Sequence, residues 1–431
     1  MKVFVGPASR LQGKVRVPPS KNYTSRYIWV SALAEGESVV RDPATNDDAR
    51  ALLACCQRLG AKVQVDEGTV RISGFGRNPR SPGVLDPGNG GLILRLLLPV
   101  GLLLPEVHYT TSYPESLGKR PQGHLLAALR DLGAEVEDVD GHLPITIRGG
   151  RPLTRRTVVV SGRISSQYAT ALLMIAPLLG GLSLQITEGL VSRPPLATTL
   201  QVMAEAGVTP QADWAQLRFT VPAGDYQPGV YHVPGDYPAA SAILAAAALV
   251  PSAVTLYPLN PADRQGEKQV IPYLQQMGVA VARNGQEVTI RGGSPLRAVD
   301  FNGEEAIDAV LSMAAVACLA EGTTTFSQVA NLRWKESDRI GDLARGLRQI
   351  GVAVTETADG FVISGNPAGY EGGIELDGCQ DHRLIMTYAV LALRTRKGLV
   401  INGAEHVSKS YPGFFTALQE LGATVEVKED N

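Results

Sequence analysis

The sequence predicts an α/β protein made of two similar domains, each containing three copies of one structural unit. A short triplet of a hydrophobic residue, a glycine and a small residue recurs six times, and the segment after four of these triplets reads as two short strands. Successive triplet glycines are separated by 73, 74, 71, 73 and 71 residues, a regularity that chance placement among 46 glycines would not readily give. These glycines are Gly60, Gly133, Gly207, Gly278, Gly351 and Gly422.

Each unit is expected to begin with a buried helix. Runs such as SAILAAAALV and LIMTYAVLAL are apolar on every side, and a helix of that kind has to be buried. A strand and an exposed amphipathic helix follow, and the triplet ends that helix. Two further strands complete the unit, as in LGAKVQVDEGTVRISG, although the last copy, LGATVEVKED, holds only one. We therefore expect sheets that wrap a set of buried helices in each domain.

Polar residues collect just before each buried helix. Helix N-termini leave backbone N–H groups unpaired and carry partial positive charge, so they cap well with such side chains and also bind phosphate or carboxylate. If the buried helices of a domain run parallel, their N-termini converge on one face, where an anionic ligand could bind. Plain helix capping explains any single position about equally well. The residues are Lys21 with Asn22, Asn89, Ser165 with Ser166, Asp236, Asp308, and Asp381 with His382.

The composition excludes several classes of protein. A chain of 431 residues with 44% hydrophobic residues can bury large cores and suggests two or three domains. A formal net charge of -2 gives no basic field for a nucleic-acid backbone. The N-terminal segment resembles neither a signal nor a transit peptide, and Pro, Gly and Arg interrupt the apolar runs, so we expect no membrane span. Four cysteines without metal-ligand spacing favour a reducing, cytoplasmic compartment and no metal site.

Several strings, spread from Lys21 to Pro412, resemble the 5-enolpyruvylshikimate-3-phosphate (EPSP) synthase family. The most specific are NLRWKESDRI and SSQYATALLMIAPL, and the others are PPSKNYTSR, GNGGLILR, KRPQGHLLAALRDLGA, DHRLIMTYAV and VSKSYPGFF. The resemblance implies two inside-out α/β domains of three repeats each, with the active site in the cleft between them. The chain crosses between domains twice in that family, and Pro18-Pro19 and Val233 to Asp236 are the candidate crossings here. The expected domains are residues 1–19 with 235–431, and residues 20–234.

The resemblance also implies an activity without a cofactor or metal: transfer of the enolpyruvyl group of phosphoenolpyruvate to shikimate 3-phosphate. We assign Asp308 as the base toward the acceptor hydroxyl, and Glu336 with Lys21 or Lys409 as the proton donor. The residues implied to contact shikimate 3-phosphate are Lys21, Asn22, Arg26, Ser165, Ser166, Gln167, Ser192, Asp308, Asn331 and Lys335. Those implied to contact phosphoenolpyruvate are Lys21, Asn89, Gly91, Arg120, Gln167, Arg339, Arg383 and Lys409.

The sequence departs from the family pattern at positions that the resemblance places in the cleft. Asn22 stands where a Ser is common, Leu92 where a Thr normally follows the Gly-rich turn, Gly90 at an Ala position, and YPAAS replaces a double-Ser string. Two alternatives therefore stay open: an acceptor such as UDP-N-acetylglucosamine, and a non-catalytic, anion-binding descendant. The related UDP-sugar enzymes carry a reactive Cys near Arg120, and SYPESLGKRP has none. We expect a monomer whose partners are its two small-molecule substrates.

Overall fold

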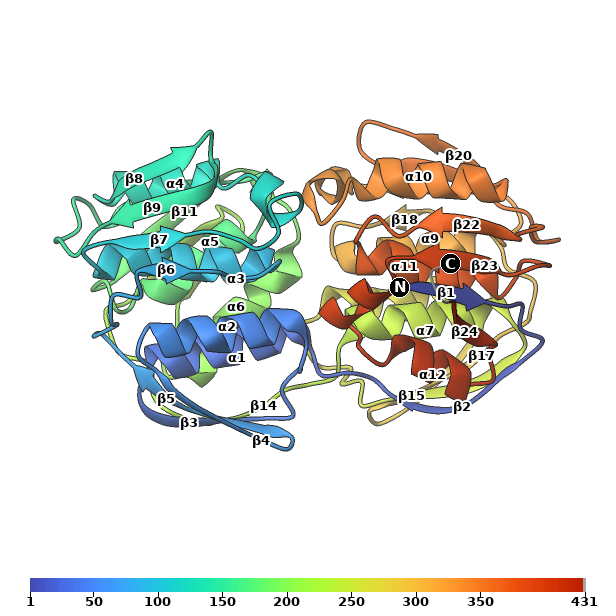
Figure 1. Ribbon diagram of the computed structural model, residues 1–431, viewed down its shortest axis with the longest axis horizontal. Coiled ribbons are helices and arrows are strands. Elements are labelled where there is room, and N and C mark those ends of the chain that lie inside the picture. The colour runs from blue at the N-terminus through green and yellow to red at the C-terminus, as the bar shows by residue number, and fades with distance from the viewer. Residues whose placement is uncertain (429–431) are drawn as a thin grey trace. The chain divides into compact units, whose positions relative to one another are not determined.

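A computed structural model describes residues 1–428, and the chain divides into two compact units. The continuous unit is Pro19–Val233, and the split unit joins Met1–Pro18 to the segment that begins at Pro234. Helices and strands alternate throughout both (Figure 1). The prediction of an α/β fold with repeated units is confirmed.

The continuous unit holds three repeats. Each contains the predicted buried helix, strand, amphipathic helix and two strands in that order, but the second and third begin with a further strand, Val84–Leu85 and Thr157–Gly162, which the sequence did not predict. The first repeat consists of α1 (Lys21–Leu33), β3 (Glu35–Arg41), α2 (Asp47–Arg58), β4 (Lys62–Asp66) and β5 (Thr69–Phe75). The second consists of β6 (Val84–Leu85), α3 (Gly91–Leu97), η1 (Leu98–Leu103), β7 (Val107–Tyr109), η2 (Leu117–Lys119), α4 (Gly123–Asp131), β8 (Glu135–Val139) and β9 (His142–Arg148). The third consists of β10 (Thr157–Gly162), α5 (Gln167–Ile175), β11 (Leu182–Leu190), α6 (Arg193–Glu205), β12 (Gln211–Asp213) and β13 (Arg218–Val221), and β14 (Val230–His232) follows it.

The split unit holds the other three repeats together with β1 (Lys2–Val5) and β2 (Leu11–Arg16). The fourth repeat consists of α7 (Tyr237–Leu249), β15 (Ser252–Tyr257), η3 (Gly266–Gln269), α8 (Val270–Gln276), β16 (Ala280–Asn284) and β17 (Glu287–Arg291). The fifth consists of β18 (Phe301–Asn302), η4 (Ile307–Ala309), α9 (Val310–Ala317), β19 (Thr323–Ser327), η5 (Ala330–Trp334), α10 (Arg339–Ile350), β20 (Ala353–Glu356) and β21 (Phe361–Ser364). The sixth consists of β22 (Ile374–Asp377), α11 (His382–Ala392), β23 (Leu399–Asn402), η6 (Ala404–Lys409), α12 (Phe414–Glu420) and β24 (Val425–Lys428).

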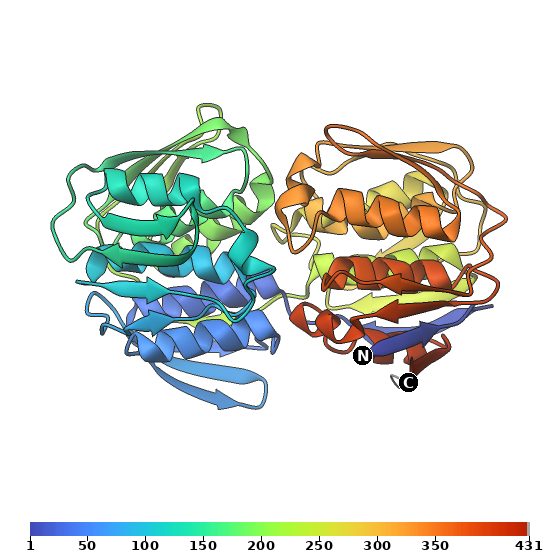
Figure 2. The same cartoon turned by 45° about the horizontal axis from the view of Figure 1, so that its top comes forward.

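Strands from distant parts of the chain complete three of the six four-stranded sheets formed within residues 1–428. The sixth repeat lacks a second final strand, and β1 takes its place between β23 and β24, antiparallel to both. Figure 2 shows β1 in dark blue among the red strands of this repeat. Strand β2 pairs in parallel with β15 of the split unit, while β14 pairs in parallel with β3 of the continuous unit. Strand β2 comes just before α1 of the continuous unit in the chain, yet it completes a sheet of the split unit. Strand β14 comes just before α7 of the split unit, yet it completes a sheet of the continuous unit.

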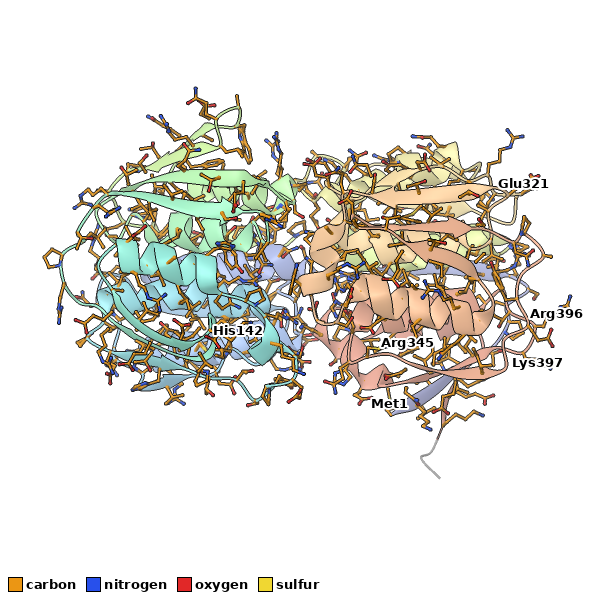
Figure 3. All side chains as sticks on the ribbon, turned by 90° about the horizontal axis from the view of Figure 1, so that it is seen from above. Met1, His142, Glu321, Arg345, Arg396 and Lys397 are labelled. Carbon is orange, nitrogen blue, oxygen red and sulfur yellow. The ribbon has the colours of Figure 1, made fainter. Side chains whose placement is uncertain are left out.

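The buried helices of the split unit run in the same direction. Near their N-termini, Ser241 of α7 bonds Ser312 of α9 at 3.0 Å between hydroxyl oxygens, and Arg383 of α11 donates to the Pro238 carbonyl of α7. At the opposite end, Arg394 donates to the Leu249 carbonyl of α7. In Figure 3, Glu321, which follows α9, lies at the same end as Arg396 and Lys397, which follow α11. The N-termini of α7, α9 and α11 consequently share one face of the unit.

The six triplet glycines end the amphipathic helices in the same way. Their φ angles lie between 86° and 110°, in the left-handed region that glycine adopts without steric cost. In each case the N–H of the residue after the glycine bonds a carbonyl five residues earlier, as from Ala61 to Cys56 and from Val352 to Leu347. This is the Schellman arrangement, which satisfies the last carbonyls of a helix. The sequence period therefore reflects the same C-terminal helix motif, which occurs in all six repeats.

A second recurring glycine lies at the end of the last strand in four repeats. The positions are Gly74, Gly149, Gly292 and Gly365. A Cβ atom at Gly74 would lie 2.1 Å from the Ala34 carbonyl oxygen and 2.3 Å from that of Ser31, at the C-terminus of α1. Gly292 and Gly365 approach carbonyls at the ends of α7 and α9 in the same way, and Gly149 approaches the Gly101 carbonyl in η1, which follows α3. Only glycine lets the strand cross the helix end this closely.

We expect Gly74→Ala to lower the free energy of unfolding by about 2 kcal/mol or more, because the added methyl group forces the strand away from the helix. Gly224→Ala is the matched control in the same unit, since a Cβ there meets nothing within 4 Å and its φ is not positive. Urea unfolding of both variants measures the difference. Equal stabilities would show that the close approach does not constrain the fold.

Side-chain capping, the alternative to anion binding for the polar residues before the buried helices, occurs at only some of these helices. Asp236 accepts from the Ala239 N–H of α7, and Asp381 accepts from the Arg383 N–H of α11. The N-cap residues of α1, α3, α5 and α9 make no side-chain cap bond, although Ser165, just before the N-cap residue of α5, accepts from the Gln167 N–H at 3.3 Å. Capping alone therefore does not explain why polar residues recur at these positions.

No helix in the described part of the chain is both long and apolar enough to cross a membrane. Within residues 1–428, no group of three or more His, Cys, Asp or Glu side chains could hold a metal ion. All four cysteines are free thiols, and Cys55, Cys56 and Cys318 are buried.

Candidate active site

Arg339 is the centre of a buried ionic cluster in the split unit. It is the first residue of α10, and its side chain is only 2% exposed. Nε and Nη2 donate to the two carboxylate oxygens of Asp381 at 2.7 and 3.1 Å. Nη2 also donates to Glu336 at 2.9 Å, and Nη1 donates to Asp308 at 3.4 Å. Although burial lowers it, the pKa of Arg339 is raised overall by the carboxylates of Asp381, Glu336 and Asp308.

Two lysines extend this cluster. Nζ of Lys409, at the end of η6, lies 2.8 Å from Oε1 of Glu336, and both side chains are nearly buried. Nζ of Lys335 lies 3.8 Å from Oδ1 of Asp308, whose side chain is 26% exposed. Asp308 is thus the most accessible of the three carboxylates in the cluster. A carboxylate that solvent or ligand can reach, with cations on one side, is suited to accept a proton from a bound hydroxyl group.

Two groups beside the cluster have unused hydrogen-bonding capacity. Nη1 of Arg383 donates to the Pro238 carbonyl at 2.5 Å, whereas its buried Nε has no partner within the described residues. The buried Oδ1 of Asn331, on η5, likewise accepts no hydrogen bond in residues 1–428. Unsatisfied buried polar atoms are costly, so a ligand that pairs with them would be favoured. Both residues were predicted to bind substrate.

The continuous unit carries a second set of buried cations. Arg26 of α1 is fully buried, and it donates to three neutral groups: the Thr199 hydroxyl, the Asn22 carbonyl and the Pro195 carbonyl, all within 3.0 Å. Burial lowers the pKa of Arg26 to about 10, which still leaves it charged near neutrality. A buried cation held by neutral acceptors is well placed to attract an anion.

Arg95 joins the predicted serine and glutamine residues into one network. Its Nη1 donates to Gln167 at 2.7 Å and to Ser165 at 3.1 Å, its Nε donates to Gln122 at 3.0 Å, and its guanidinium lies over the Tyr168 ring. These bonds fix the polar groups at the N-terminus of α5. Ser166, the N-cap residue of that helix, is buried beside them without making a side-chain cap bond.

Arg120 and Lys21 are the other cations of this unit that were predicted to bind substrate. A Cβ at Gly91, the first residue of α3, would lie 2.7 Å from Nη1 of Arg120, so glycine allows the guanidinium to approach the helix N-terminus. Nζ of Lys21, the first residue of α1, lies 3.4 Å from Oδ2 of the buried Asp48. The structure thereby brings Gly91 and Arg120 together, as expected for two residues predicted to bind one anion.

The remaining predicted residues lie at helix N-termini. Asn22 is the second residue of α1, Asn89 precedes α3, and Ser192 precedes α6 with a left-handed φ of 59°. Ser192 is close in sequence to Pro195, whose carbonyl binds Arg26. These three residues therefore lie at helix N-termini, where backbone N–H groups and the helix dipole favour anions.

The charges on each unit point to anionic ligands. In the continuous unit, Lys21, Arg26, Arg95 and Arg120 are cations, and Asp48 is the acidic partner described above. In the split unit, four cations (Lys335, Arg339, Arg383 and Lys409) accompany three carboxylates (Asp308, Glu336 and Asp381). Arg and Lys in this setting bind carboxylate and phosphate groups, and the carboxylates can carry protons.

Sequence reasoning missed several residues that hold the site in place. Asp48 pairs with Lys21, and Gln122, which is fully buried, orients Arg95 and donates to the Arg120 carbonyl. Asp381, singled out only as a polar residue before a helix, is both the cap of α11 and the main partner of Arg339. The string TNDDAR is the only sequence signal for Asp48, and RPQG is the only one for Gln122. Neither string shows which helix its loop will contact.

Three of the four departures from the family pattern have local structural explanations, and nothing in the structure explains Asn22. Leu92 packs into the core of the continuous unit, and a Cβ at Gly90 would lie 2.6 Å from the Ile93 side chain. In YPAAS, the Tyr237 N–H donates to Gln265 and the Pro238 carbonyl accepts from Arg383. Ser241, the serine that remains, binds Ser312. These changes therefore leave the charged clusters intact.

Comparison with known proteins identifies the family. The family model for EPSP synthase (3-phosphoshikimate 1-carboxyvinyltransferase) matches residues 5–429. A 3-phosphoshikimate 1-carboxyvinyltransferase of Deinococcus radiodurans is 46% identical over 429 residues, which is 99% of this chain and 97% of that protein. One from Burkholderia pseudomallei is 36% identical, covering 98% and 95% of the two chains.

Solved structures agree in fold. An EPSP synthase from Acinetobacter baumannii superimposes with a TM-score of 0.81 at 27% identity, over 99% of this chain and all of the other. The enolpyruvyl transferase NikO from Streptomyces tendae gives a TM-score of 0.78 at 18% identity over 99% and 98% of the chains, which supports the fold alone. With a family match over almost its full length and the predicted residues gathered on each unit, the chain belongs to the EPSP synthase family.

Proposed function

We propose that the protein transfers the enolpyruvyl group of phosphoenolpyruvate to the 5-hydroxyl of shikimate 3-phosphate and releases inorganic phosphate, a step of chorismate biosynthesis. The arrangement of Asp308, Glu336 and Lys409 around Arg339 is the observation that carries this proposal. It supplies an accessible carboxylate and a buried carboxylate–lysine pair, fixed by one guanidinium. A reaction that needs one base and one acid in the presence of anionic substrates fits this set.

Cations from both units are proposed to bind the two substrates. Arg120 with Gly91, together with Arg339, Arg383 and Lys409, would bind the carboxylate and phosphate of phosphoenolpyruvate. Planar guanidinium forks match both groups. Arg26 with Ser165, Ser166 and Gln167 would bind the phosphate and ring hydroxyls of the acceptor, and Ser192, Asn331 and Lys335 would complete its contacts. Both units have to contact the same pair of substrates, so the predicted interdomain position of the active site remains part of this proposal.

The proposed chemistry has two steps. In the first, Asp308 takes the proton of the acceptor 5-hydroxyl while its oxygen bonds to C2 of phosphoenolpyruvate, and a proton donor adds a proton to C3. In the second, C3 loses a proton, the double bond reforms, and the C2–O bond to phosphate breaks, so phosphate leaves with its electron pair. Glu336 is the proposed donor, with Lys409 bound to it at 2.8 Å or Lys21 as the alternative. Fixing both substrates would lower the entropic barrier to their reaction.

The remaining properties follow from the chain itself. The four free thiols favour a reducing cytoplasm over an oxidising compartment. We propose that the protein is a monomer. We also propose that it uses no cofactor, because acid–base groups and fixed cations suffice for the reaction described above.

The identity of the acceptor is tested by incubating the protein with phosphoenolpyruvate and either shikimate 3-phosphate or UDP-N-acetylglucosamine. Mass spectrometry of the acceptor measures the addition of one enolpyruvyl group. We expect the adduct with shikimate 3-phosphate and none with the UDP-sugar. The reverse result would assign the protein to the UDP-sugar reaction, and binding of both ligands without any adduct would favour the non-catalytic descendant.

A further inference from the structure

Glu267 is a buried carboxyl group beside the Asp308 base to which no role has been assigned. It lies in η3, just before α8, and is 7% exposed. Its Oε1 accepts a hydrogen bond from the backbone N–H of Asp308 at 3.4 Å. Asp308 belongs to η4, a helical turn of three residues at the start of α9. Glu267 therefore connects the fourth repeat to the turn that carries the base.

The loop before Glu267 is itself held rigidly. Gln265 accepts from the Tyr237 N–H and donates to the Gly235 carbonyl, both at the N-terminus of α7. Its Nε2 also donates to Asp263 at 2.6 Å, and Asp263 accepts from the Gln265 N–H. These bonds fix the course of the chain into η3. Glu267 is consequently presented to Asp308 by a structured loop.

The charged groups around Glu267 come from three elements. Asp308 faces it from η4, Asp236 from the start of α7, and Arg383 from α11, while the sequence of α8, VIPYLQQ, holds no charged residue. Burial, followed by the negative charges of Asp308 and Asp236, raises the pKa of Glu267 to about 8, and Arg383 opposes this shift. At neutral pH the carboxyl group is therefore mostly uncharged. Ionisation at higher pH places a further negative charge next to Asp308.

We propose that Glu267 is a positioning residue that anchors the turn carrying Asp308 and adds no negative charge to the acceptor site while the enzyme is active. This inference rests on the proposed function, because it concerns the base of that reaction. A neutral carboxyl group still has an oxygen that accepts the hydrogen bond from the Asp308 N–H, and it does not repel a phosphorylated substrate. A charged one repels the phosphorylated substrate.

The variant Glu267→Gln separates these two effects, because glutamine keeps the acceptor oxygen and the shape but cannot ionise. We expect it to retain activity within about threefold of the unmodified protein at pH 7, and the fall of kcat/KM for shikimate 3-phosphate on the alkaline side to move up by about one pH unit or more. Asp263→Asn is the matched control, since Asp263 is a buried carboxyl group in the same loop that bonds Gln265. It should leave the alkaline side of the profile in place.

The variant Glu267→Ala removes the anchor. We expect kcat to fall about tenfold or more at every pH while KM for phosphoenolpyruvate changes little, because the base loses its orientation. Backbone hydrogen exchange at Asp308, measured by mass spectrometry, should accelerate in Glu267→Ala and remain slow in Glu267→Gln. This readout does not depend on turnover, so it distinguishes failure of the anchoring role from failure of the proposed function.

The proposal is overturned if Glu267→Gln leaves the alkaline side of the profile unchanged, or if exchange at Asp308 is the same in all variants. If Glu267→Ala does not fold, the pH profile and exchange rate of Glu267→Gln still decide the question. If the unmodified protein releases no phosphate with either acceptor, the proposed function fails, and the exchange measurement alone then tests the anchor.

Discussion

Replacing Asp308 with asparagine is expected to lower acceptor-dependent phosphate release by about 10²–10⁴-fold, the usual contribution of a general base. Asparagine matches the carboxylate in shape but cannot take the hydroxyl proton. The fold should survive, because Arg339 keeps Asp381 and Glu336 as partners. Binding of shikimate 3-phosphate, measured by calorimetry, should change little, so the loss appears in kcat.

Asp300→Asn is the matched control for this variant. Asp300 lies in the same repeat, is exposed, and accepts a hydrogen bond from the Thr325 N–H at 2.8 Å. Its replacement should leave phosphate release within about twofold, as surface substitutions usually do. If Asp308→Asn kept the full rate, the base would have to be another group.

Replacing Arg339 with glutamine is expected to lower the free energy of unfolding by about 3–5 kcal/mol, because it leaves buried carboxylates without their cation. Asp381 is fully buried and Glu336 nearly so, and both bind this guanidinium within 3.1 Å. Urea unfolding measures the loss. Phosphoenolpyruvate binding should weaken as well, since a proposed ligand of its anionic groups is removed.

Arg345→Gln provides the control on the same helix. Arg345 lies 2.6 Å from Asp342, but its side chain is 57% exposed, and Figure 3 shows it on the outside of α10. Asp342 is 18% exposed, and a pair whose cation is open to solvent contributes about 1 kcal/mol or less. Similar losses in the two variants would mean that the buried cluster does not hold this part of the fold together.

The sequence was sufficient to predict the repeats because the same physical requirement recurs in each one. A Schellman glycine has to end every amphipathic helix, and an all-apolar helix has to be buried, so both leave a periodic pattern. The completion of the sixth repeat by β1 leaves no such pattern. Strand pairing between β1 and β24 joins segments more than 400 residues apart, and local sequence does not specify the partner.

The candidate site was predictable only where a family string marks it. The clusters around Arg339 and Arg95 contain residues that the resemblance supplied, such as Glu336 and Gln167. Asp48 and Gln122 act through contacts with other elements of their own repeats, Glu267 acts through a contact with the next repeat, and their own strings resemble ordinary loops. Their roles depend on how the helices pack, which periodicity does not reveal. The roles of individual site residues in catalysis stay predictions.

Inorganic phosphate release from phosphoenolpyruvate, measured with and without shikimate 3-phosphate, tests the central claim most directly. The account predicts release only when both compounds are present, at a rate that depends on the concentration of each. Release without the acceptor would indicate a hydrolase. If the protein binds both compounds but releases no phosphate, the proposed transfer is contradicted. The protein would then be a non-catalytic, anion-binding member of the family.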